Sequence, residues 1–66
     1  MLNIVNFYEI VINLDNNYEN NGIAVEPYNI YIELISKYGE NYKDIIKEAI
    51  EEYYLVFLDW YEEGEQ

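Results

Sequence analysis

An all-α fold of three helices, ending in a long amphipathic helix, is the architecture predicted for this 66-residue chain. Two observations support it. Apolar residues recur at spacings of three and four along three segments, which is the period of helices that are buried on one face. Stretches rich in Asn and Gly separate these segments, and such residues favour turns. At this length we expect a single domain, 1–66.

The first helix is expected over residues 3–16, followed by a loop over 17–26. Its polar positions recur at helical spacing: Asn3, Asn6, Glu9, Asn13 and Asn16. The alternative is an α+β fold, in which segments 2–14 and 28–35 are strands of an N-terminal hairpin before a C-terminal helix. The many β-branched and aromatic residues favour that reading.

The second helix is expected over residues 27–38. Pro27 suits a first helical turn, and Gly39 stands where a helix would end. The third helix is expected over 42–63, with Asn41 as its N-cap and Asp44 three residues later. Its buried stripe would comprise Ile45, Ile46, Ala49, Ile50, Tyr53, Val56, Phe57, Trp60 and Tyr61.

The charge of the chain indicates the chemistry of its partner. Fourteen acidic residues against three Lys give a formal net charge of −11. The abundant Ile, Asn and Tyr have AT-rich codons, and drift toward such codons would also have supplied Lys, so we interpret the lack of cations as selected. A chain this acidic is repelled by anionic lipid and by nucleic acid. We therefore expect a basic nucleic-acid-binding protein as partner, with no direct contact to nucleic acid or membrane.

The third helix would carry acidic residues on the side opposite its core. At 100° per residue, this side holds Glu48, Glu51, Glu52, Asp59 and Glu62, with Glu63 near its edge. Six carboxylates over roughly 24 Å of helix give about one charge per 4 Å. One DNA strand carries a phosphate per roughly 3.4 Å, so this face predicts a nucleic-acid mimic. The rival interpretation is a solvated face on a non-mimic interaction module.

Leu55 and Leu58 would lie among these glutamates. Apolar side chains inside a charged face are candidates for contact with a partner or with a second copy in a homodimer. Packing into the core remains open for both.

A weaker metal-binding hypothesis comes from the first loop. Asp15, Asn17, Glu19 and Asn21 alternate, and Glu26 is the twelfth residue. This spacing resembles the calcium loop of the EF-hand family, which implies a small calcium-binding helix-loop-helix protein. The pattern departs from that family at its sixth and eighth positions, Asn20 and Gly22.

Catalysis is not expected. The chain has no Cys, His, Arg or Thr and a single Ser, so it cannot assemble a nucleophile with a base or a phosphate clamp, and we expect no cofactor. Met1 leads into LNIVNF without the basic region of a signal peptide, which predicts a cytoplasmic protein.

In size and composition this acidic, aromatic-rich chain is similar to small phage-encoded inhibitors, namely anti-CRISPR proteins and inhibitors of uracil-DNA glycosylase. The resemblance implies an inhibitor that blocks the nucleic-acid groove of a defence or repair enzyme in the cytoplasm of a host cell.

Overall fold

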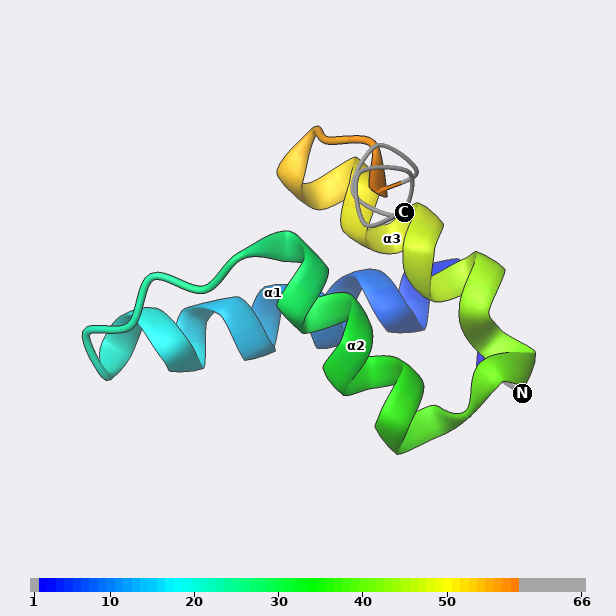
Figure 1. The fold of residues 1–66 in the computed structure, drawn as a ribbon, viewed down its shortest axis with the longest axis horizontal. Helices are drawn as coiled ribbons and strands as arrows, with labels where there is room; N and C mark the ends of the chain where they lie inside the picture. The colour runs from blue at the N-terminus through cyan, green and yellow to red at the C-terminus, as the bar shows by residue number, and fades with distance from the viewer. Residues whose placement is uncertain (1, 59–66) are drawn as a thin grey trace, which may run out of the picture.

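The computed structural model describes residues 2–58, which form three α-helices and one short 3₁₀ helix (Figure 1). These are α1 (Ile4–Asn20), α2 (Pro27–Tyr38), η1 (Glu40–Tyr42) and α3 (Lys43–Tyr54). The predicted all-α fold with three helices is confirmed. The strand alternative for segments 2–14 and 28–35 is wrong, since residues 4–14 lie in α1 and residues 28–35 lie in α2.

Helix α1 starts at a reciprocal cap and runs further than predicted. The Asn3 side chain accepts a hydrogen bond from the Asn6 backbone N–H at 3.1 Å, and the Asn6 side chain accepts one from the Asn3 N–H at 2.9 Å. The helix then continues to Asn20, so residues 17–20 belong to it and not to a loop. A tertiary contact holds this extra turn, because the Tyr18 hydroxyl donates to the Glu33 carboxylate of α2 at 2.6 Å.

The bounds of α2 follow the predicted ones. Pro27 occupies its first turn, and Gly39 ends it with φ of 96°, a backbone angle that side chains with a Cβ rarely adopt. The predicted Asn41 cap is wrong. Residues 40–42 form η1, which leads directly into α3, and no side chain caps that helix.

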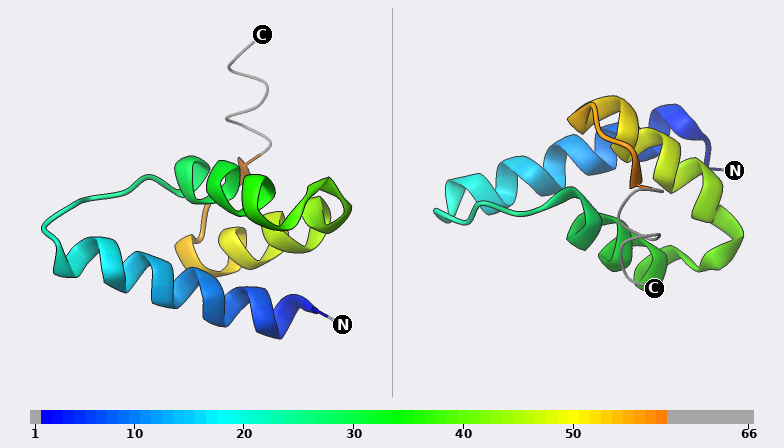
Figure 2. Two further views of the ribbon diagram at one scale, coloured as in Figure 1. Left: turned by 90° about the horizontal axis from the view of Figure 1, so that it is seen from below. Right: turned by 45° about the horizontal axis from the view of Figure 1, so that its top comes forward.

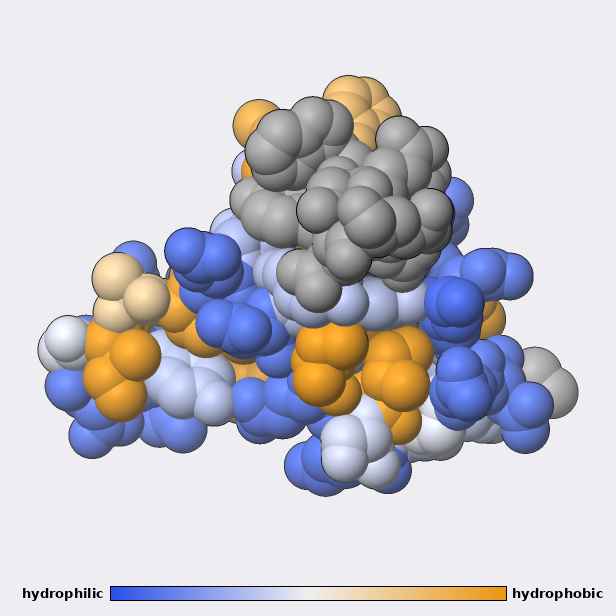
Figure 3. Space-filling view, in the orientation of Figure 1, coloured by the Kyte–Doolittle hydropathy of each residue, from blue (hydrophilic) through white to orange (hydrophobic). Residues whose placement is uncertain are grey.

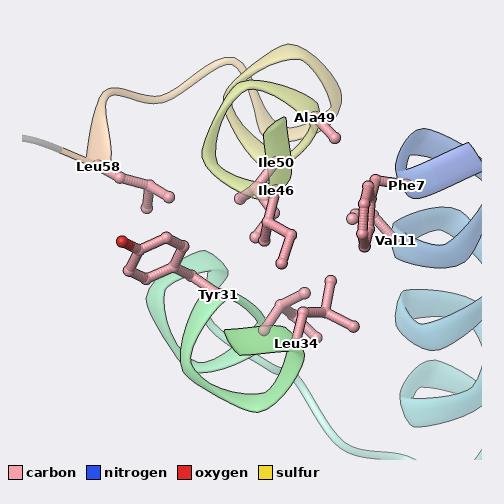
Figure 4. Close-up of a cluster of buried hydrophobic side chains, with 9 residues drawn as sticks. Phe7, Val11, Tyr31, Leu34, Ile46, Ala49, Ile50 and Leu58 are labelled. Carbon is pink, nitrogen blue, oxygen red and sulfur yellow. The ribbon is translucent and has the colours of Figure 1, made fainter. Parts of the chain in front are cut away.

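Helix α3 lies between the other two and packs against both, whereas α1 and α2 meet each other much less (Figure 2). All three helices contribute to one core (Figure 4). Its buried side chains are Phe7, Val11, Ile30, Tyr31, Leu34, Ile46, Ala49, Ile50 and Leu58. Each fully buried Leu, Ile or Phe contributes about 1.5–3 kcal/mol, and this core stabilises a chain without disulfides. None of the helices in residues 2–58 is long and apolar enough to cross a membrane.

Candidate functional site

The site is built by the end of α3, where the chain turns sharply at Leu55. Leu55 has φ of 58° and ψ of 46°, the left-handed conformation, and its N–H donates to the Glu51 carbonyl at 2.8 Å. Such a residue ends a helix. The predicted helix over 42–63 is therefore wrong in its bounds, because α3 stops at Tyr54.

The chain beyond this turn returns to the core. The Leu58 N–H donates to the Glu51 carboxylate at 2.9 Å, and the Leu58 side chain is fully buried. Figure 4 shows it pointing toward Tyr31 of α2 from the segment after α3. Leu58 is thus a core residue, which corrects its prediction as a partner contact.

The same turn moves Phe57 to the surface. On an unbroken helix Phe57 would share the inward face with Tyr53, but the left-handed residue changes the direction of the chain. Phe57 is 78% exposed and Leu55 is 87% exposed. Figure 3 shows hydrophobic atoms at the top of the molecule, where this segment lies. Leu55 therefore projects outward, which settles against core packing for this residue, and Phe57 is an exposed apolar side chain that helical periodicity wrongly assigned to the buried stripe.

These side chains surround a hollow of about 450 Å³. We call its lining the Leu55 face, which consists of Glu48, Glu51, Glu52, Leu55, Val56 and Phe57. Four predicted site residues come together here: Glu48, Glu51, Glu52 and Leu55. The chemistry of this face is mixed. Its carboxylates attract cations, and burial of the Leu55 and Phe57 side chains by a partner would lower the free energy of the complex.

The other predicted acidic contacts, Asp59, Glu62 and Glu63, lie outside the described residues. Since α3 ends at Tyr54, the predicted row of carboxylates along one unbroken helix from Glu48 to Glu63 is wrong. Of the predicted carboxylates only Glu48, Glu51 and Glu52 lie in α3, and they span roughly 6 Å of helix axis. Glu51 also holds the Leu58 N–H, so part of its hydrogen-bonding capacity is used inside the protein.

The predicted calcium loop is wrong for a geometric reason. Asp15, Asn17 and Glu19 lie inside α1, where alternate residues point about 200° apart and cannot converge on one ion. Glu26 immediately precedes α2 and is exposed. Within residues 2–58 no group of three acidic side chains is placed to hold a metal.

Asp15 has a structural role instead. Its carboxylate accepts hydrogen bonds from the Tyr53 hydroxyl at 3.1 Å and the Tyr54 hydroxyl at 2.7 Å, which joins the end of α3 to the middle of α1. Burial, together with these bonds to Asp15, raises the pKa of both hydroxyls above the ordinary value of 10.0. The hydrogen bond to Glu33 likewise raises the pKa of Tyr18. These three hydroxyls therefore keep their protons to higher pH and act as hydrogen-bond donors.

Comparison with family models, with curated proteins and with solved structures finds no match for this chain.

Proposed function

We propose that this chain is an inhibitor-type binding protein that docks on a basic surface of another protein through the Leu55 face. The observation that carries the proposal is the exposure of Leu55 and Phe57 around a hollow bordered by three glutamates. A partner that buries such side chains gains roughly 1.5–3 kcal/mol for each. The carboxylates add electrostatic steering and select a cationic surface.

A groove that normally holds nucleic acid is the target that fits this charge best. Such grooves are lined by cations that neutralise phosphates, and the chain brings a formal charge of −11 with only three Lys. Support for mimicry comes from this total charge, since α3 is too short for phosphate-like spacing over many turns. By resemblance to phage-encoded inhibitors, the target would be a defence or repair protein in the cytoplasm of a host cell.

A capture experiment tests the proposal. The immobilised chain is exposed to bacterial lysate at low and at high salt, in parallel with the variants Phe57→Ser and Ile23→Ser. Ile23 is the matched control, because it is also an exposed apolar residue but lies in the loop before α2. A protein retained by wild type and Ile23→Ser, but lost with Phe57→Ser and at high salt, supports the proposal.

Equal retention by Phe57→Ser would contradict docking through the Leu55 face.

The protein that wild type retains is purified in complex with it and challenged with duplex DNA and with RNA. Displacement by either one supports nucleic-acid mimicry. Simultaneous binding of the chain and nucleic acid would instead identify a non-mimic interaction module.

A further inference from the structure

A second hollow lies between the first turns of α1 and the last turn of α3. It is lined by Ile4, Val5, Tyr8, Glu9 and Glu52, is open to solvent and has a volume of about 310 Å³. Val5 is 61% exposed, and the exposed Tyr8 ring stands one turn further along the same face of α1. We call this the α1/α3 hollow. Helical periodicity places Val5 next to buried positions but gives no sign of a cavity there.

The walls of this hollow are held in place. The Tyr8 ring packs edge-on against the Tyr53 ring, with centroids 6.0 Å apart. Tyr53 in turn donates its hydroxyl to Asp15. Because this aromatic wall is fixed before any partner arrives, docking costs less ordering than on a loose surface. Glu52 lines this hollow and the one at the Leu55 face, so the two are neighbours.

The charge around the hollow selects its occupant. Glu9 and Glu52 are exposed carboxylates in its lining, and none of the residues within 2–58 that line it is a cation. A second copy of the chain would bring its own net charge of −11 against them. A segment that carries Lys or Arg beside an apolar side chain is complementary to both the rim and the interior.

We infer that the α1/α3 hollow receives one large apolar side chain from a Lys- or Arg-rich amphipathic segment of the partner. The inference rests on the proposed function and specifies which part of a basic partner makes contact. The hollow is open to solvent, and its apolar lining by Ile4, Val5 and Tyr8 suits contact with one large apolar side chain. The Tyr8 ring offers an additional surface to a flanking cation.

A defined peptide tests this inference without the natural partner. The probe is a synthetic Lys-rich amphipathic helix with Phe at the centre of its apolar face, and the matched peptide has Ser at that position. Binding is measured by calorimetry and by the NMR shifts of the Val5 methyl groups. The protein variants are Val5→Gln and the control Ile32→Gln, since Ile32 is a similar β-branched residue, 48% exposed, on α2.

We expect the Phe peptide to shift the Val5 methyl signals and to bind wild type and Ile32→Gln equally. Val5→Gln and the Ser peptide should each weaken binding at least about tenfold, which corresponds to about 1.4 kcal/mol. Equal affinity of the two peptides, or the absence of measurable binding, would overturn the inference.

Three results separate this inference from the proposed function. Peptide shifts confined to Leu55 and Phe57, or lysate capture that requires Phe57 but tolerates Val5→Gln, would refute the α1/α3 hollow and leave the Leu55 face intact. Capture that tolerates Phe57→Ser, beside peptide binding that requires Val5, would refute the Leu55 face alone. Concentration-dependent broadening of the Val5 signals without peptide would identify a second copy as the occupant and overturn the inference.

Discussion

Replacing Leu55 by Gly should stabilise the protein. Leu55 is the one residue other than Gly with positive φ among residues 2–58. For a side chain with a Cβ this conformation costs roughly 1–2 kcal/mol. Gly removes that cost, but it destabilises the folded protein by roughly 0.5–1 kcal/mol because Gly makes the unfolded chain more flexible. Leu55 is almost fully exposed, so deleting its side chain forfeits little burial.

The central values of these two ranges leave a gain of about 0.75 kcal/mol for Leu55→Gly, which raises the melting temperature by about 3–6 °C in a domain of this size. Leu55→Ala is the matched control, because Ala removes most of the side chain and keeps the unfavourable Cβ. Thermal unfolding followed by far-UV circular dichroism compares the two variants. If Leu55→Gly melts at or below Leu55→Ala, the left-handed end of α3 is refuted.

Three further predictions concern neighbouring contacts. Leu58→Ala should lower the free energy of unfolding by about 2–5 kcal/mol, because Leu58 is buried, whereas Phe57→Ala should change it by about 0.5 kcal/mol or less. Urea denaturation measures both values, and a larger loss for Phe57→Ala would contradict the burial of Leu58 and the exposure of Phe57. The free energy of unfolding should fall as the pH rises above 10.0, because Tyr54 has a higher pKa in the folded protein than in the unfolded chain and therefore loses its proton more easily when the chain unfolds. Urea denaturation midpoints measured across this pH range should fall less steeply for Tyr54→Phe than for wild type. Calcium should leave the near-UV circular dichroism of the tyrosines unchanged, and a saturable change would restore the calcium hypothesis for Asp15.

Much of the fold could be predicted from local patterns. The helical period identified all three helices, and Pro27 and Gly39 marked both ends of α2 because their backbone preferences act locally. The extra turn of α1 could not be predicted in this way. It depends on a bond between Tyr18 and Glu33, which are distant in sequence.

The candidate site was only partly predictable for the same reason. Glu48, Glu51, Glu52 and Leu55 were recognised from charge and helical phase. The end of α3 carries no Gly or Asn to signal a left-handed residue, and the apolar spacing continues through Phe57. The break is accompanied by the burial of Leu58 and its bond to Glu51, which no local pattern encodes. Asp15 was misassigned to a metal site because its tyrosine partners lie 38 and 39 residues away.

The two bonds that Glu51 accepts have a consequence for how this surface could diversify. Its carbonyl holds Leu55 and its carboxylate holds Leu58, so one side of α3 fastens both ends of a short exposed loop. Val56 packs against the core, whereas Leu55 and Phe57 contribute little to it, and exposed loop positions on a rigid scaffold tolerate sequence change. Exchanging Leu55 and Phe57 would therefore change the chemistry of this surface while the three helices stay as they are.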